Sequence, residues 1–253
     1  MTIELGLTPD SRWDVGVPGL VAAAAEAGFS AVGMPGPQVD AACAATLAAQ
    51  GLRCHELLAL VVSADEEATV REARRLAEAA AAVRAQWVLT TFMAPLQGRT
   101  GPLVERCAAM FAEAGAGMAV EFSPLGAVTS ISAALEVAEA AGKDRAGVLI
   151  DSWHFFRGDS SWDQLESVPL EMIAYVQFDD APPPVSENAM KETMHRRVMP
   201  GEGTFELDQF ASTLLKRGWE GLVSVEVLSS ELRRLPVPEF ARRAYETTVR
   251  YWR

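Results

Sequence analysis

Residues 147–154 read GVLIDSWH, an apolar run that ends on the carboxylate of Asp151. Three other runs are built the same way, with a polar side chain late in each: MAVEFSP at 118–124 carries Glu121, IAYVQFDDA at 173–181 carries Gln177, and LVSVEVLS at 222–229 carries Glu226. Short apolar runs rich in β-branched residues are typical of strands buried on both faces of a parallel sheet. Parallel strands closed into a barrel bring their C-terminal ends to one mouth, so we expect these four side chains to meet there.

Strand-like and helix-like segments alternate along the whole chain. The expected strands are short apolar segments, at 3–7, 31–34, 52–61, 87–92, 118–122, 148–151, 173–178 and 222–228. The expected helices carry apolar stripes or end signals, at 17–27, 39–50, 63–84, 102–114, 130–141, 161–166, 207–217 and 238–250. This alternation predicts an α/β fold, the (β/α)8 TIM barrel, as a single domain over residues 1–253. An open doubly wound sheet is the alternative, but no GxGxxG motif follows the first strand.

Two connections carry more specific predictions. Ser63 followed by Glu66 resembles a capping box at the start of the third helix. The segment 179–204 is far longer than a typical β-to-α connection, which predicts a loop or lid at the mouth. Within it, 187–197 can form one or two helical turns, and Gly201 with Gly203 would let the backbone approach a ligand closely.

Composition excludes several functional classes. A net charge of −12 disfavours binding to nucleic acid, and the chain has no apolar run long enough to cross a membrane. The start of the chain, MTIELGLTPD, lacks the pattern of a secretory signal. Cys43, Cys54 and Cys107 have no CxxC spacing, which favours buried reduced thiols. We therefore expect a soluble cytoplasmic protein without nucleic-acid or membrane partners, and self-association into a homo-oligomer is left open.

The four strand-end side chains form a candidate metal site. Carboxylate and amide oxygens are hard donors, which favour one divalent ion such as Mn²⁺, Mg²⁺ or Co²⁺. Without a cation, three clustered carboxylates would repel one another and raise at least one pKa. Any one of the four residues could simply end a strand. Their equivalent places on successive strands favour the metal site, with Glu121, Asp151, Gln177 and Glu226 as ligands.

The segments VEF, IDSWH, VQFDD, RVMPGEG and VSVEV resemble those of the xylose isomerase-like TIM-barrel superfamily of sugar isomerases, epimerases and related lyases. The similarity covers nearly the whole chain, and its specific part runs from Glu121 to Glu226. It implies the same four metal ligands, a substrate-binding histidine at His154 and a substrate-binding arginine at Arg197. Many sugar epimerases of this group have histidine where Gln177 stands, whereas the 3-dehydroshikimate dehydratase branch has glutamine. Some epimerases carry a further glutamate at the position that Ala127 occupies in this chain, so that glutamate is absent here.

These groups suit proton transfer next to a carbonyl. A metal that chelates a substrate's carbonyl and hydroxyl oxygens lowers the cost of the enediolate formed when the α-proton leaves. Glu121 and Glu226 could act as base and acid, and His154 could hold or protonate a substrate oxygen or be a solvated rim histidine. The sequence thus predicts a metal-dependent sugar or polyol isomerase or epimerase. Its substrate would be a small keto-sugar, polyol or cyclic hydroxy-ketone.

Two alternatives remain open. A metal-dependent dehydratase would expel a β-hydroxyl group from the same enediolate, and Gln177 favours it. A barrel without catalysis could serve as a binding or partner subunit.

The other candidate substrate-binding residues are Arg157 and Trp153. Trp153 could wall the mouth or simply pack in the core. His195, Arg196 and Arg197 form a basic run that could close over an anionic substrate or lie on a solvated helix face. His55 is expected to pack in the core or behind the ligands, and Asp179 with Asp180 to orient the ligands or end the strand.

Overall fold

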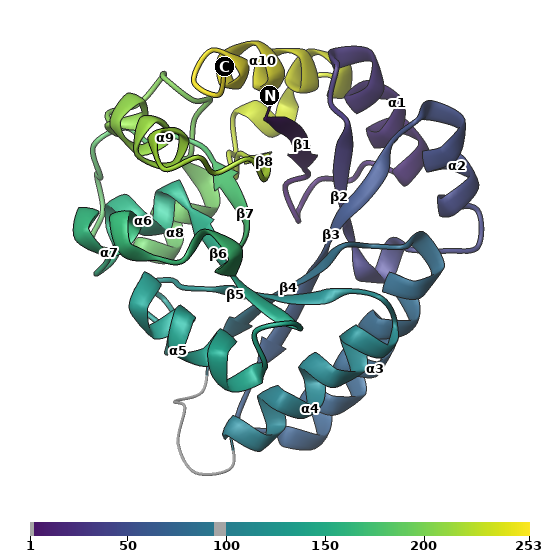
Figure 1. Cartoon of the computed structure of the whole chain (residues 1–253). Helices are drawn as coiled ribbons and strands as arrows, with labels where there is room; N and C mark the ends of the chain where they lie inside the picture. The colour runs from purple at the N-terminus through teal and green to yellow at the C-terminus, as the bar shows by residue number, and fades with distance from the viewer. Residues whose placement is uncertain (1–2, 94–99) are drawn as a thin grey trace.

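Eight parallel strands form a closed barrel in the computed structural model of the chain, which describes residues 3–93 and 100–253 (Figure 1). Each strand pairs with its neighbours in chain order, and β1 pairs with β8 to close the sheet. The strands are β1 (Glu4–Thr8), β2 (Ala31–Pro35), β3 (Arg53–Val62), β4 (Trp87–Phe92), β5 (Gly117–Glu121), β6 (Ala146–Asp151), β7 (Ile173–Phe178) and β8 (Leu222–Glu226). The predicted (β/α)8 TIM barrel is confirmed.

Helices surround the barrel and cover the outer faces of its strands (Figure 1). They are α1 (Val17–Ala27), α2 (Cys43–Gln50), α3 (Glu66–Val83), α4 (Thr100–Glu113), α5 (Ile131–Ala141), α6 (Ser152–Arg157), α7 (Trp162–Ser167), α8 (Ala189–His195), α9 (Leu207–Lys216) and α10 (Val237–Val249). Short 3₁₀ turns lie at η1 (Gly36–Gln38), η2 (Leu170–Met172) and η3 (Leu232–Arg234). None of the helices in the described part of the chain combines the length and apolar character needed to span a bilayer.

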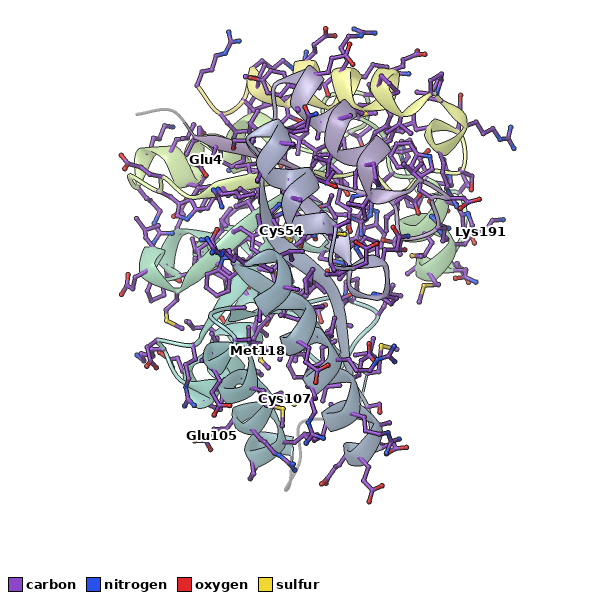
Figure 2. The ribbon with its side chains drawn as sticks, turned by 90° about the vertical axis from the view of Figure 1, so that its right-hand side faces the viewer. Glu4, Cys54, Glu105, Cys107, Met118 and Lys191 are labelled. Carbon is purple, nitrogen blue, oxygen red and sulfur yellow. The ribbon has the colours of Figure 1, made fainter. Side chains whose placement is uncertain are left out.

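The alternation of side chains along each strand divides the core into two layers. In β6, Val148 and Ile150 pack outward against the helices, whereas Leu149 packs into a separate cluster inside the barrel. All three cysteines are free and buried, and Cys54 and Cys107 lie among the packed side chains of the outer layer (Figure 2). The same alternation sends Asp151, two residues after Leu149, to the inner side at the mouth.

Helices α2 and α3 begin at residues other than those that the sequence predicts. The capping box predicted at Ser63 is wrong, because Asp65 caps α3 and its side chain accepts a hydrogen bond from the Ala68 N–H at 2.9 Å. Ser63 instead accepts one from the Asp65 N–H. The second helix begins at Cys43 rather than at 39, since the Asp40 carboxylate accepts the N–H groups of Ala42 and Cys43 and holds a turn before it.

The long segment after β7 folds back on itself. Asp180 and Val198 form an antiparallel bridge, and α8 lies in the excursion between them, with Lys191 projecting at the edge of the molecule (Figure 2). The Asp180 carboxylate accepts the N–H groups of Gly201 and Gly203 at 3.1 and 3.0 Å. A Cβ at Gly203 would lie 2.3 Å from Asp180 Oδ1, so this glycine makes room for a protein carboxylate rather than for a ligand.

Candidate metal centre and active site

The barrel brings the four predicted strand-end residues to one place. Glu121 and Asp151 end β5 and β6, Gln177 precedes the last residue of β7, and Glu226 ends β8. Asp151 lies opposite Gln177 in the register, and Gln177 lies opposite Ser224, two residues before Glu226. The residues share the inner face because each strand alternates sides with period two.

The four side chains differ in their access to solvent. The Asp151 side chain is 1% exposed and Gln177 is fully buried, whereas the Glu121 and Glu226 side chains are 13% and 10% exposed. The two glutamates therefore keep carboxylate surface open to the mouth. Of the four residues, these two can reach a bound small molecule most directly.

His154 belongs to the same cluster. It lies on α6, a helix that the sequence reading missed because it starts directly after β6; the Asp151 Oδ1 atom caps it by accepting the His154 N–H at 2.9 Å. His154 Nε2 lies 3.5 Å from Glu121 Oε1 and 3.9 Å from Asp151 Oδ2. Ligand atoms of Glu121, Asp151 and His154 all lie within 4.8 Å of one another, a spacing that could hold one cation. Burial lowers the pKa of His154, but the charge of Asp151 and the contact with Glu121 outweigh burial and raise it.

Arg197 donates hydrogen bonds to two of the candidate ligands and to Asp179. Its Nη1 donates to Asp179 Oδ2 at 2.6 Å, to Asp151 Oδ2 at 3.1 Å and to Glu226 Oε2 at 3.3 Å. Its Nε and Nη2 donate to the Thr193 hydroxyl. The side chain is 2% exposed, so its donors serve protein groups and it orients the two ligand carboxylates.

One guanidinium does not balance this many acids. Burial, together with the charges of Asp151, Glu56 and Glu121, raises the pKa of Glu226 well above its ordinary value despite Arg197. Burial likewise raises the pKa of Asp179 to about 7. Burial also acts to raise the pKa of Asp151, but the charges of Arg197 and His154 lower it overall. Ionising all of these carboxyl groups together is therefore costly, and a divalent cation would favour their charged forms.

Gln177 shows how the residues fit such a cation. Its Nε2 donates to Glu56 Oε2 at 3.2 Å, while its Oε1 is buried and has no hydrogen-bond partner among the described residues. An unpaired buried carbonyl oxygen is costly unless a ligand satisfies it. A free hard oxygen beside three carboxylates is a donor set suited to Mn²⁺, Mg²⁺ or Co²⁺.

The sequence reading missed Glu56, which lies wholly inside the barrel. Its carboxylate accepts hydrogen bonds from Thr8, Tyr175, Gln177 and, at 3.1 Å, His55 Nε2. Burial acts to raise the pKa of Glu56, yet His55 and these hydrogen bonds outweigh burial and lower it. A signal was present in RCHELLALVV: two adjacent polar residues in an otherwise apolar strand.

The remaining candidates lie beside the cluster. The Arg157 guanidinium donates to the Pro182 carbonyl at 2.8 Å and lies over the Phe205 ring, so it anchors the start of the long segment. Trp153 is buried, with the Arg197 guanidinium 5.4 Å from its ring centroid. The basic run at 195–197 does not form one surface, because Arg197 turns inward whereas Arg196 pairs with Glu192.

The sequence profile of the xylose isomerase-like TIM barrel family matches residues 21–253. The chain belongs to this family. An inosose isomerase of Halalkalibacterium halodurans is 34% identical over 138 residues, 53% of this chain and 48% of that protein. A 3-dehydroshikimate dehydratase of Pseudomonas aeruginosa is 29% identical over 103 residues, 41% of this chain and 16% of that protein. The match with the inosose isomerase thus spans about half of that relative's length.

Solved structures agree on the fold. The crystal structure of the IolI protein with a binding zinc atom superposes with a TM-score of 0.87. The two chains are 20% identical, and the superposition covers 98% of each. At this level of identity the likeness establishes the shared barrel.

Proposed function

We propose that the chain is a divalent-metal-dependent isomerase or epimerase that moves a proton at the carbon next to a carbonyl group. The observation that carries this proposal is the convergence of four oxygen-bearing side chains from β5 to β8, two of which keep solvent access. The relatives named inosose isomerase support a polyhydroxy-ketone as the substrate class. We infer a keto-sugar, a polyol or a cyclic hydroxy-ketone.

Glu121, Asp151, Gln177 and Glu226 would hold the metal, with His154 adjoining Glu121 and Asp151. A divalent cation bound there would supply Lewis-acid stabilisation of the negative charge that develops on the substrate oxygens. The IolI protein was crystallised with a binding zinc atom, which agrees with a cation in a barrel of this shape. The oxygen-rich donor set of this chain favours Mn²⁺, Mg²⁺ or Co²⁺.

The side chains of the site would have separate roles in the reaction. Glu121 and Glu226 lie on β5 and β8, on either side of Asp151 and Gln177, so one can remove the α-proton and the other can return it. His154, whose Nε2 lies 3.5 Å from Glu121 Oε1, would donate a hydrogen bond to a substrate oxygen. Arg197 holds Asp151 and Glu226 in position without facing solvent.

The test is exchange of the α-proton. Purified protein with Mn²⁺ is incubated in D₂O with scyllo-inosose or D-fructose. Replacement of the proton next to the carbonyl by deuterium is followed as the loss of its proton NMR signal. The native protein should exchange the α-proton of at least one of these substrates. Glu226→Gln should keep its fold and, with Mn²⁺ raised until the site is saturated, should lose roughly 100-fold or more in rate. Equal exchange by the variant would exclude Glu226 from proton transfer.

A dehydratase is the second candidate, because Gln177 and the matched 3-dehydroshikimate dehydratases favour it. In this reaction the same α-proton leaves and a β-hydroxyl group departs as water. Incubation with 3-dehydroshikimate and Mn²⁺ would yield an aromatic product seen by ultraviolet absorbance. A protein that binds Mn²⁺ yet neither exchanges protons nor forms this product would be a binding barrel instead.

A further inference from the structure

A second polar cluster lies below the candidate metal centre, inside the barrel. Glu56 on β3 is its hub, and its partners are Thr8 on β1, the adjacent His55, and Tyr175 and Gln177 on β7. A fully buried carboxylate is costly unless hydrogen bonds satisfy its oxygens. Here each carboxylate oxygen accepts from two side chains: Oε1 from Thr8 and His55, and Oε2 from Tyr175 and Gln177.

The backbone is shaped to place this hub. The register between β2 and β3 shifts, with Val32 opposite Cys54 and Gly33 opposite Glu56, so His55 is an extra residue in a bulge. The bulge lets two successive side chains, His55 and Glu56, both face the barrel interior. Glycines provide the space: a Cβ at Gly33 would lie 2.6 Å from Glu56 Oε1, and one at Gly6 would lie 3.1 Å from the His55 ring.

The contact with Gln177 links this hub to the mouth. An amide has one end that donates and one end that accepts, and only the NH₂ end can pair with a carboxylate. Because Nε2 donates to Glu56, the carbonyl end is left as the free one, and Gln177 Oε1 is the buried atom without a partner among the described residues. If the amide were reversed, Gln177 Oε1 would face Glu56 Oε2, and neither oxygen could donate a hydrogen bond to the other.

We infer that Glu56 is a positioning residue, which fixes the amide of Gln177 so that its carbonyl oxygen is presented to the metal. Glu56 is not one of the four proposed ligands, and its positioning role acts through the Gln177 amide. This inference rests on the metal site proposed above. It adds a requirement from β3, a strand outside the four that carry the ligands.

The test measures the dissociation constant of Mn²⁺ by isothermal titration calorimetry, without substrate. Glu56→Gln should weaken Mn²⁺ binding by about 10- to 100-fold, the range found when a partner of a metal ligand is removed. Gln177→Ala should weaken it as well, and the double variant should be no weaker than Gln177→Ala. Such non-additivity is expected if Glu56 acts through Gln177.

Thr8→Val is the matched control, because it removes a hydrogen bond from the other carboxylate oxygen and leaves the Gln177 contact in place. It should change Mn²⁺ affinity less than about threefold. If Glu56→Gln does not fold, the exchanged pair, Glu56→Gln with Gln177→Glu, is measured instead. In this double variant an amide again donates to a carboxylate, with the two groups exchanged between the strands. That pair should bind Mn²⁺ more tightly than Gln177→Ala.

The outcomes separate the two proposals. If the native protein binds no Mn²⁺, the metal site and this inference both fall. If the native protein binds Mn²⁺ and Glu56→Gln binds it equally well, or if the two effects simply add, only the positioning role of Glu56 is overturned. An exchanged pair that binds no better than Gln177→Ala would overturn it in the same way.

Discussion

Arg197 is a buried guanidinium whose Nη1 donates to Asp151, Asp179 and Glu226. Arg242 on α10 instead forms an ion pair with Glu246 in which both side chains are more than half exposed. The two arginines therefore occupy opposite electrostatic situations. Removing a buried partner strands charge in a medium of low dielectric, whereas an exposed pair competes with water and salt.

The two arginines provide a first prediction. Arg197→Met should destabilise the metal-free protein by about 3–5 kcal/mol, because three buried carboxylates lose their shared cation. Arg242→Met, which removes one partner of an exposed ion pair, is the control and should cost at most about 1 kcal/mol. Urea unfolding in EDTA, followed by circular dichroism, measures both. Equal losses in the two variants would show that Arg197 does not carry this charge balance.

Cys107 offers a prediction about pH. Burial raises the pKa of its thiol to about 11 from an ordinary 9.0. The folded pKa lies above the unfolded one, so the stabilisation is complete below pH 9 and is lost as pH rises towards 11. At a pH of about 8, the fraction of Cys107 present as thiolate is about two orders of magnitude smaller in the folded protein than in the unfolded protein. This difference should suppress alkylation of folded Cys107 by iodoacetamide. Mass spectrometry should show rapid labelling only in urea, and labelling of Cys107 at the same rate in folded protein would contradict its burial.

At the scale of elements, the start of α3 shows how local signals compete. Ser63 and Asp65 are both cap-forming residues, and both precede a glutamate-rich first turn. The backbone places Asp65, with φ −86° and ψ 92°, as the residue whose side chain meets the Ala68 N–H. A short sequence pattern cannot distinguish them, because either register satisfies the preference for an oxygen at the helix start.

The cap can be tested by paired substitutions. Asp65→Ala should destabilise the protein by about 1 kcal/mol, since it leaves a helix N–H unpaired. Ser63→Ala removes a hydroxyl that lies outside the helix and should cost less than about 0.5 kcal/mol. Thermal unfolding of the two variants under the same conditions decides between them. A larger destabilisation by Ser63→Ala than by Asp65→Ala would contradict the cap at Asp65 and support the capping box that the sequence predicts.

At the scale of the whole molecule, the barrel concentrates charges that are far apart in sequence. Glu121 and Glu226 come from the fifth and eighth strands, and Glu56 comes from the third. Their clustering costs free energy in the metal-free fold, as the raised pKa of Glu226 indicates. A cation that binds only the folded state would recover this cost by mass action.

Metal removal supplies the prediction at this scale. Mn²⁺ at about 100 times its dissociation constant should stabilise the protein by about 2.7 kcal/mol, and EDTA should reverse the gain. For a chain of this size, the shift in Tm should be roughly 5–10 °C. Asp151→Asn should bind the metal less well and show a smaller shift. An unchanged Tm in the native protein would contradict the metal site.

The sequence by itself determined the barrel and the four strand-end residues at its mouth. Both follow from local patterns: buried strands read as apolar runs, and the C-terminal end of every strand opens at the same face. The position of Asp151 and Gln177 late in their apolar runs predicts that both lie at the mouth, and the register places them opposite each other.

Only the tertiary structure decided the partners of those residues. Arg197 turned inward instead of joining a basic surface, because carboxylates from three different elements meet there. Glu56 and His55 both entered the barrel, because a bulge in β3 breaks the alternation on which sequence reasoning depends. Hydrogen bonds between distant strands depend on register and on space left by glycines such as Gly33. These are properties of the closed sheet, and no single strand's sequence contains them.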